Sequence, residues 1–343
     1  MQNEHQRCRW KRSTAYAALQ LCRPFGLLQP GVVTFDWNVE LIFSIAGVGL
    51  KIDSGHLTLP AEPWKHEIRR RFVVAGKEHA DDDREQIDVF LTADPAPGVT
   101  AYQRIFDSRD SWSIYSHHDE TYVTDQYPPF SAPVWTARCR LNHNRVDIFC
   151  SSEIIDPQTL TLAFNPVAYP LDQILLMNYL ALHDGVIMHA AGWALNGSGW
   201  VFPGKSGDGK TTLTRCLSGL RKGQILSDDR IVIRRTGQTF RMYGTPWPGE
   251  GGYAVNRGVK LNRLVFLSKG SVNKMMALEP AAVVSRLMPV LSIPWYDKEK
   301  VVALTAFCDL LIKRVPAYEL TFRADSSVMD FLKAHVHEFN QSL

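Results

Sequence analysis

The sequence lacks the marks of several classes of protein. Its six cysteines include no C-x-x-C pair, and none stands at metal-ligand spacing with a histidine, which favours free thiols in a reducing cytosol. No apolar run reaches the roughly 20 residues that a membrane helix needs, and the N-terminus has no secretory apolar core. We therefore expect a cytoplasmic protein without a membrane partner.

The chain also lacks a strong excess of either charge. Its 343 residues include 38 lysines and arginines against 35 acids, for a net charge of +3. Residues 1–24 hold five basic side chains and a single acid, so the remainder is close to −1 and we expect no nucleic-acid partner. The basic start is interpreted as a solvated terminus, with contact to an acidic partner as the alternative.

Length and a hydrophobic content of 45% predict two domains with real cores. We assign a basic segment to residues 1–30, a β-rich domain to 31–165 and an α/β catalytic domain to 166–343. The boundary rests on a change of pattern, because Pro170 precedes a helical apolar stripe that ends near His183.

Short alternating segments and frequent turn signals predict strands in the first half. The candidates are Val32–Phe35, Leu41–Ser44, Ile87–Thr92, Ser111–Tyr115, Val134–Leu141 and Arg145–Cys150. The last two alternate around Asn142-His143-Asn144, which predicts a hairpin. Two polar clusters, at 81–83 and 117–120, are interpreted as solvated loops, with metal binding as the alternative.

The second half alternates strand and helix patterns. A hairpin of Val186–Leu195 and Trp200–Phe202 turns near Asn196-Gly197. Further strands are expected at Gln224–Ser227, Ile231–Arg234, Leu261–Leu267 and Ala317–Phe322, and helices at Leu213–Leu220, Pro280–Val290, Lys298–Val315 and Ser326–His337. The glycine- and proline-rich stretch Tyr243–Tyr253 predicts a loop shaped for a ligand or a mobile lid.

The stretch from Gly204 to Thr211 fits the phosphate-binding pattern G-x-x-x-x-G-K-[ST] at every fixed position. Its glycines let successive N–H groups point at a phosphate, and the helix that follows offers its positive end to the same anion. The expected nucleotide-binding residues are Gly204, Ser206, Gly207, Asp208, Gly209, Lys210, Thr211 and Thr212. The alternative is a glycine-rich turn without a ligand.

Four further residues are candidates for chemistry. Asp228 and Asp229 follow an apolar strand some eighteen residues after Lys210, which suits a base and a Mg²⁺ ligand beside a phosphate. Glu250 is the acid of the glycine-rich stretch Tyr243–Tyr253. His189 lies on the strand before residues 204–211, which we call the phosphate loop. The alternatives are an ordinary Asp-Asp turn and a histidine satisfied in the core.

Taken in order, these landmarks resemble the catalytic domain of the HPr kinase/phosphorylase family. The family has a histidine before the hairpin, a G-x-S-G-x-G-K-[ST] loop, a strand that ends in paired aspartates and a later glycine-rich loop with a glutamate. The resemblance covers roughly the last 175 residues and is greatest to the divergent relatives encoded beside peptide-modification genes of the lasso-peptide type. It implies the mixed, twisted P-loop sheet shared with phosphoenolpyruvate carboxykinases.

The resemblance implies an ATP- and Mg²⁺-dependent kinase that phosphorylates a serine of a peptide or small protein. We find neither the R-G-L-G-type sequence that accompanies phosphorylase activity nor the regulatory family's N-terminal domain, so the reverse reaction and the substrate HPr do not follow. A small-molecule hydroxyl kinase and a nucleotide-dependent ATPase or switch are the alternatives. The sequence leaves the oligomeric state open, including a homo-oligomer.

In the expected mechanism the phosphates of ATP lie on residues 207–211, with Lys210 at the transferred phosphate. Mg²⁺ is held by Thr211, Asp229 and Glu250. Asp228 accepts the proton of the acceptor hydroxyl, and His189 either donates to a phosphate oxygen or tunes Asp228. The β-rich half is expected to dock the peptide, by adding a strand to an exposed edge.

Overall fold

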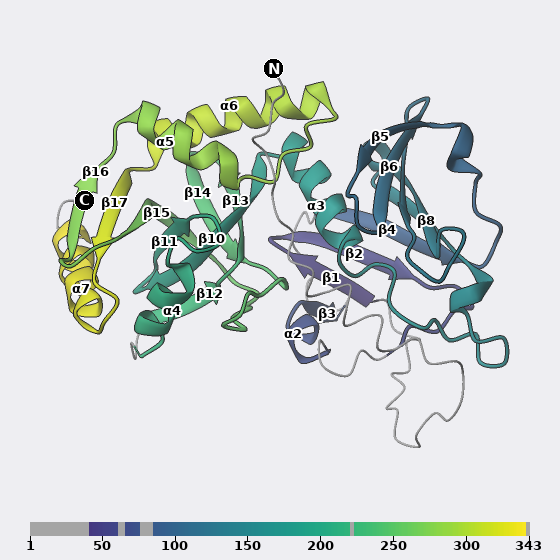
Figure 1. Ribbon diagram of the computed structural model, residues 1–343, viewed down its shortest axis with the longest axis horizontal. Coiled ribbons are helices and arrows are strands. Elements are labelled where there is room, and N and C mark those ends of the chain that lie inside the picture. The colour runs from purple at the N-terminus through teal and green to yellow at the C-terminus, as the bar shows by residue number, and fades with distance from the viewer. Residues whose placement is uncertain (1–40, 61–65, 76–84, 220–222, 341–343) are drawn as a thin grey trace. The chain divides into compact units, whose positions relative to one another are not determined.

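The computed structural model describes residues 41–60, 66–75, 85–219 and 223–340 (Figure 1). The chain divides into two units, Met1–Phe35 and Asp36–Leu343, and every described residue lies in the second. The basic segment, the strand expected at Val32–Phe35 and the acidic cluster at 81–83 fall outside the described residues. The second unit contains helices and two mixed β-sheets, so the predicted α/β class with a mixed sheet is confirmed.

The first sheet has nine strands in the order β3-β1-β2-β4-β9-β8-β7-β6-β5. β2 pairs with β4, and β4 with β9, in parallel, while the other neighbours are antiparallel. The strands are β1 (Leu41–Ile45), β2 (Val48–Asp53), β3 (Val73–Ala75), β4 (Glu85–Thr92), β5 (Gln103–Asp107), β6 (Trp112–His117), β7 (Glu120–Asp125), β8 (Trp135–Arg140) and β9 (Arg145–Cys150).

Alternation explains the strands that the sequence predicts. In β4, Ile87, Val89 and Leu91 are buried while their neighbours are partly exposed, as a sheet with one covered face requires. The predicted hairpin is confirmed, because β8 and β9 are antiparallel neighbours joined through Asn144 at φ 51°. The sequence reading missed β2, β3, β5 and β7, among which β3 has only three residues and β5 is mostly exposed.

One buried carboxylate organises the outward face of this sheet. Asp147 on β9 is contacted by Arg145 (2.8 Å), Arg138 (3.0 Å) and Arg140, which come from β9 and the neighbouring strand β8. Burial alone would raise the pKa of Asp147, but the hydrogen bonds from the three guanidinium groups outweigh it and lower the pKa. Asp147 therefore stays ionised and links the two strands.

The second sheet has eight strands in the order β11-β10-β13-β14-β15-β17-β16, with β12 paired to β10 and β11 also paired to β15. They are β10 (Gly185–Leu195), β11 (Ser198–Pro203), β12 (Gly223–Ser227), β13 (Arg230–Thr236), β14 (Thr239–Gly244), β15 (Gly258–Lys269), β16 (Lys274–Ala277) and β17 (Ala317–Phe322). Because β15 returns to β11, the strands β11, β10, β13, β14 and β15 form a closed ring. The predicted hairpin of β10 and β11 is confirmed.

β10 is the strand on which the functional elements meet. It is eleven residues long and pairs with β11 through its second half, from Ala190 to Leu195. Two strands share its other side: β13 pairs with Gly185–His189, and β12 pairs with Gly192–Leu195 after a register shift. The chain therefore passes from β12 to β13 at the middle of β10, and Asp228 and Asp229 occupy that passage.

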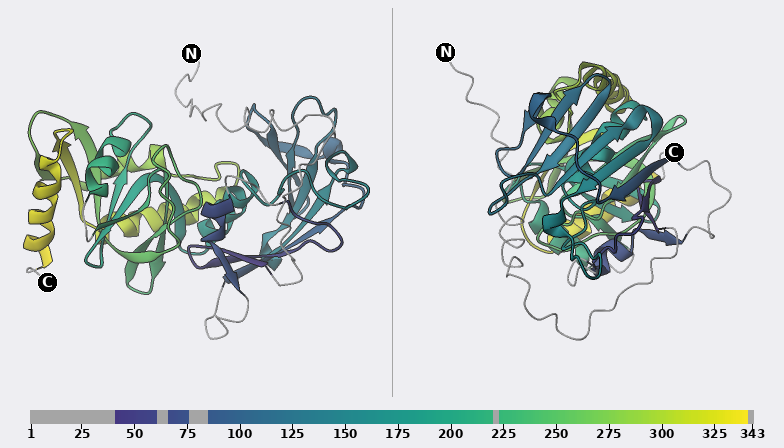
Figure 2. Two further views of the ribbon diagram at one scale, coloured as in Figure 1. Left: turned by 90° about the horizontal axis from the view of Figure 1, so that it is seen from below. Right: turned by 90° about the vertical axis from the view of Figure 1, so that its right-hand side faces the viewer.

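The helices are α2 (His66–Arg70), α3 (Leu171–Leu182), α4 (Lys210–Ser218), α5 (Pro280–Leu287), α6 (Lys298–Arg314) and α7 (Ser327–Asn340). Two of them begin with favourable residues, since Pro280 is the first residue of α5 and the Asp297 carboxylate accepts the Lys300 N–H at the start of α6. Figures 1 and 2 show α4 and α6 on opposite sides of the second sheet. Side chains of α4 and α7 share one core, and those of α5 and α6 share another.

A third core joins the two halves of the described chain. It contains the inward side chains of the first sheet and most of α3, together with Ile187, Val232, Trp247 and Ala254 from the second half. The boundary predicted near residue 166 thus lies next to a helix that packs against the first sheet. The division into two domains remains a prediction.

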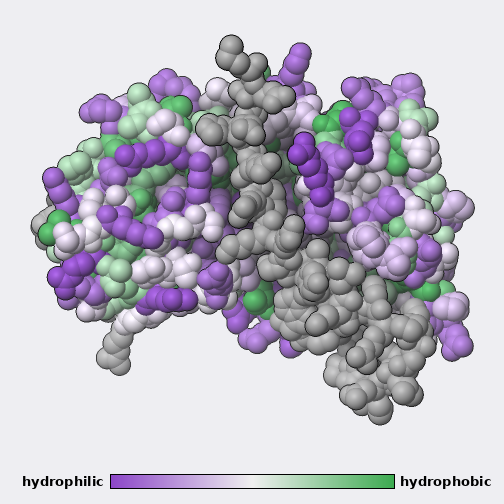
Figure 3. All heavy atoms as spheres, viewed as in Figure 1, coloured by the Kyte–Doolittle hydropathy of each residue, from purple (hydrophilic) through white to green (hydrophobic). Residues whose placement is uncertain are grey.

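Within the described part of the chain, no helix has the length and apolar character to span a bilayer. Hydrophobic side chains on the face shown in Figure 3 are scattered among hydrophilic ones. Four of the cysteines are described, and Cys139, Cys150, Cys216 and Cys308 are all free thiols, as the sequence predicts.

We expect Asp147→Asn to destabilise the protein by about 1–3 kcal/mol, because three arginines lose their shared carboxylate. Since folding lowers the pKa of Asp147, its contribution is present above the unfolded pKa of about 3.9 and is lost as pH falls through the folded pKa. Urea unfolding at about pH 7 and about pH 3 measures the free energy of unfolding of both proteins. The difference between Asp147→Asn and wild type should be smaller at about pH 3.

The control is Asp309→Asn, which removes an exposed pair with Lys313 on α6. It should change stability by less than about 0.5 kcal/mol at either pH. An equal effect of the two substitutions at about pH 7 would contradict the role given to Asp147.

Candidate active site

The phosphate loop has the predicted setting of strand, loop and helix. β11 ends at Pro203, the loop follows, and α4 begins at Lys210. Gly207 and Gly209 have φ of 97° and 101°, a region that side chains other than glycine rarely adopt. The glycines of the pattern therefore match the conformation, and the loop leads directly into the N-terminus of a helix.

Asp208 supports the loop from within. Its carboxylate accepts the Lys205 N–H at 2.5 Å, and a Cβ added to Gly204 would lie 2.9 Å from the same oxygen. Ser206 lies in the exposed part of the loop, and Thr211 and Thr212 are half-buried in the first turn of α4. Asp208 thus holds the turn, which leaves the backbone N–H groups of the loop as its donors for a phosphate.

Lys210 is buried beneath the loop. Its ammonium group donates to the Gly204 carbonyl at 2.7 Å and to the Lys205 carbonyl at 2.9 Å. Burial lowers the pKa of Lys210, and the nearby Asp229 and Asp208 carboxylates oppose that effect only in part. Two of the three ammonium hydrogens are used in these bonds, so the third is available for an anion in the loop.

Backbone hydrogen bonds join the loop to the paired acids through β10. The Gly204 N–H donates to the His189 carbonyl at 3.2 Å, and the Ala190 N–H donates to the Asp229 carbonyl at 3.0 Å. His189 also stands opposite Arg230 in the register of β10 and β13. The histidine, the start of the phosphate loop and the second aspartate thus meet at the middle of β10.

The side chain of Asp229 lies between two basic groups. His189 Nε2 lies 3.0 Å from one carboxylate oxygen, and Arg230 Nε lies 3.3 Å from the other. Burial alone would raise the pKa of Asp229, but the His189 hydrogen bond and the charges of Arg230 and Lys210 outweigh it and lower the pKa. Asp229 is therefore an ionised carboxylate, about a third exposed, beside the loop lysine.

Asp228 points elsewhere. It is 3% exposed, and its two oxygens accept the Gly249 N–H at 2.9 Å and the Gly251 N–H at 2.6 Å. The sequence interpretation made Asp228 the base and gave His189 either a phosphate oxygen or Asp228 as its partner, whereas the structure places His189 against Asp229. The backbone N–H groups of the glycine-rich loop occupy the carboxylate that was expected to receive a proton.

Of the predicted loop Tyr243–Tyr253, Tyr243 and Gly244 belong to β14, and the glycine-rich loop of the structure is Thr245–Ala254, with exposed Glu250 at its tip. A turn closes around Glu250, where the Gly252 N–H donates to the Gly249 carbonyl at 3.2 Å. The described residues contain no group of three or more histidines, cysteines and acids arranged to hold a metal. Glu250 and Thr211 are thus not assembled into a metal centre by protein ligands alone.

Two residues that the sequence reading missed lie near the site. Arg230 directly follows the acid pair and contacts Asp229, so its place next to the motif was an available signal. Tyr169 precedes α3, and burial raises its pKa to about 12 while the nearby charge of Arg230 opposes the rise. No local pattern marks Tyr169, because its proximity to Arg230 and Asp229 depends on the tertiary fold.

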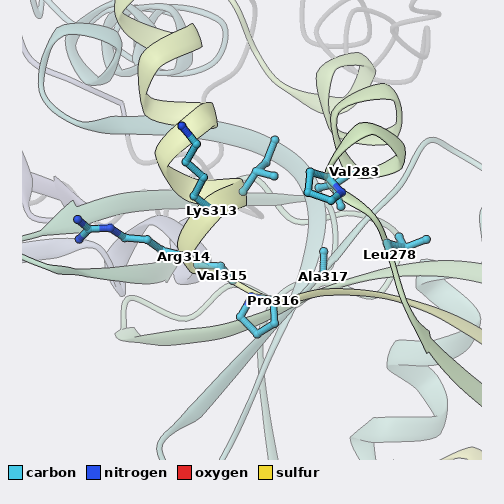
Figure 4. A pocket seen from close by; sticks show the side chains of 9 residues that line it. Leu278, Val283, Lys313, Arg314, Val315, Pro316 and Ala317 are labelled. Carbon is cyan, nitrogen blue, oxygen red and sulfur yellow. The ribbon is translucent and has the colours of Figure 1, made fainter.

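Two other features hold none of the expected site residues. The cluster at 117–120 gathers no metal ligands, and His117 stacks on Tyr102 with ring centroids 4.1 Å apart. A cavity of about 230 Å³ lies among α5, the end of α6 and the start of β17 (Figure 4). Its two basic side chains, Lys313 and Arg314, bond to Asp309 and Gln238.

Comparison with known proteins adds little to this geometry. No protein-family model and no curated protein matches the chain. Among solved structures, the Hpr(Ser) kinase/phosphatase from Coxiella burnetii matches at 12% identity and a TM-score of 0.26, over 46% of this chain and 99% of that chain. The match is to the family that the motifs resemble, but similarity at this level supports no conclusion, and the peptide-modification branch is untested.

We expect Gly209→Ala to destabilise the protein more than Gly207→Ala. Both glycines have a positive φ, which costs an alanine about 1–2 kcal/mol, but a Cβ at Gly209 would also lie 3.2 Å from the Phe322 ring. At Gly207 no atom lies within 4 Å of the added carbon. Urea unfolding of the two variants measures the difference, and equal stability would show that the ring does not constrain the loop.

Proposed function

We propose that this protein is an ATP- and Mg²⁺-dependent kinase that transfers the γ-phosphate to the hydroxyl of a serine in a peptide or small protein. One observation carries the proposal: His189 joins the phosphate loop to an ionised carboxylate, since its carbonyl accepts the Gly204 N–H and its Nε2 lies 3.0 Å from Asp229. Phosphoryl transfer requires positioning and neutralisation of charge more than covalent chemistry, and these groups supply both.

The nucleotide's phosphates bind to the backbone N–H groups between Gly207 and Thr211, at the N-terminus of α4. Two hydrogens of the Lys210 ammonium group bond to loop carbonyls, and the third donates to the transferred phosphate. Gly204 and Ser206 shape the entrance of the loop, Asp208 supports it, and Thr212 continues the first helical turn.

Oxygen donors suit Mg²⁺, and Thr211 and exposed Glu250 fit that chemistry. Mg²⁺ in kinases takes few protein ligands and many oxygens from phosphates and water, which agrees with the absence of a protein metal cluster among the described residues. Asp229 already faces His189 and Arg230, so we assign it to proton transfer and leave the metal to Thr211 and Glu250. When bound, the ion neutralises charge on the phosphates.

Asp229 accepts the proton of the acceptor hydroxyl as the new O–P bond forms and the bond to the leaving diphosphate breaks. His189 and Arg230 hold the two oxygens of Asp229 and keep the carboxylate ionised. Arg230 and Lys210 also place positive charge beside the group in transfer. We give Asp228 no part in proton transfer, because its side chain is 3% exposed, whereas that of Asp229 is about a third exposed.

We place the docking of a peptide acceptor at β5, an edge strand of the first sheet whose residues are mostly exposed. An extended peptide can add a strand to such an edge through backbone hydrogen bonds. Ile105 lies where the register between β5 and β6 shifts. If Ile105→Pro left phosphorylation of the peptide unaffected, this edge would be excluded as the docking site.

We expect Lys210→Ala to weaken ATP binding about tenfold or more, because a buried ammonium group beneath the phosphates is lost. The matched control is Lys205→Ala, which removes an exposed lysine of the same loop. It should change the affinity by less than about threefold. Titration calorimetry compares the two, and equal losses would assign the effect to net charge instead of to the site.

We expect Asp229→Asn to lower the rate of phosphate transfer by about 10²–10⁴-fold while ATP affinity changes by less than about threefold. The assay follows label from the γ-phosphate of ATP into hydroxyl-bearing peptides, small proteins and small alcohols. If the label appears only as free phosphate whichever acceptor is present, the result would favour an ATPase or switch over a kinase. A labelled small alcohol would restrict the proposal to small-molecule acceptors.

A further inference from the structure

The fixed position of the glycine-rich loop depends on one buried carboxylate. Asp228 Oδ1 accepts the Gly249 N–H at 2.9 Å, and Oδ2 accepts the Gly251 N–H at 2.6 Å. These two N–H groups flank Glu250, so the carboxylate holds the tip of the loop from both sides.

The loop sequence is fitted to this contact. A Cβ at Gly251 would lie 2.7 Å from the Asp228 carboxylate and 2.8 Å from the Tyr253 ring. A Cβ at Gly249 would lie 3.1 Å from the same carboxylate oxygen and 3.2 Å from the Asp229 Cβ. Only residues without a Cβ allow the backbone to approach Asp228 on both sides of Glu250.

Other contacts fix the ends of the loop. The Thr245 hydroxyl donates to the Arg230 carbonyl at 2.7 Å, and Ala254 forms an isolated β-bridge with Ser227. Both anchors lie beside the acid pair, on β13 and β12. Between them, Gly249 and Gly251 are the points at which the tip contacts Asp228.

We propose that Asp228 is a positioning residue that clamps the tip of the glycine-rich loop and so fixes the turn that carries Glu250 next to the acid pair. The inference rests on the proposed function in one respect, namely that Glu250 serves the bound Mg²⁺. Asp228 and Asp229 then have separate tasks: the first orients a loop through backbone N–H groups, and the second, held by His189 and Arg230, faces the reaction.

The first experiment measures hydrogen exchange of the segment 246–254 in Asp228→Asn. The amide of the new asparagine places an N–H against one of the two loop N–H groups, so the clamp loses at least one bond. We expect exchange of Gly249 and Gly251 to accelerate about tenfold or more. The control is Asp147→Asn, the same change at another buried carboxylate, which should leave exchange of the loop unaltered.

A second variant, Gly251→Ala, leaves Asp228 in place and forces the loop away from it. It should accelerate exchange in the same segment, which keeps the test valid if Asp228→Asn does not fold. Unchanged exchange in whichever of the two variants folds would overturn the clamp.

The second experiment measures the Mg²⁺ concentration that half-saturates binding of a fluorescent ATP analogue. We expect Asp228→Asn and Glu250→Gln each to raise it by about tenfold, and the double variant to raise it no further, because Asp228 acts through Glu250. Additive effects would show that Asp228 acts independently and would overturn the positioning role. If Glu250→Gln left the half-saturating Mg²⁺ concentration unchanged, the role of Glu250 in binding the metal would be refuted within the proposed function. The hydrogen-exchange experiment would still test whether Asp228 clamps the loop.

Discussion

The pairing of β10 with two successive strands on one side is the constraint on which the site depends. β13 covers the first half of β10 and β12 the second, so the chain must pass from one to the other at the middle of the strand. That passage carries the two aspartates. Because the other side of β10 pairs with β11, which delivers the phosphate loop, His189 stands between the loop and the acids.

Two neighbouring carboxylates at such a passage meet different partners. Asp228 turns into the protein, where two backbone N–H groups donate to it, whereas Asp229 lies between His189 and Arg230 and is about a third exposed. The proposed division of roles rests on this difference in exposure, since a side chain that is 3% exposed is shielded from a substrate hydroxyl. The partly exposed carboxylate of Asp229 is accessible to one.

The sequence was sufficient for the features that local patterns encode. The phosphate loop, the hairpin before it, the hairpin of β8 and β9, and helices α5 to α7 follow from spacing, turn residues and caps. It was not sufficient for the roles of Asp228 and Asp229, because these depend on a register shift in β10 and on glycines more than twenty residues away. The sequence reading missed β14 and β5 for a similar reason, because pairing with neighbouring strands makes these segments strands more than the pattern of their own residues does.

The same dependence on distant residues extends the site into the first half of the chain. Trp247 and Ala254 of the glycine-rich loop belong to the core that contains the first sheet and α3. Arg71, which follows α2, donates to the Ala254 carbonyl at 3.2 Å. Asp228 fixes the tip of the loop, whereas the first half contributes to fixing its end.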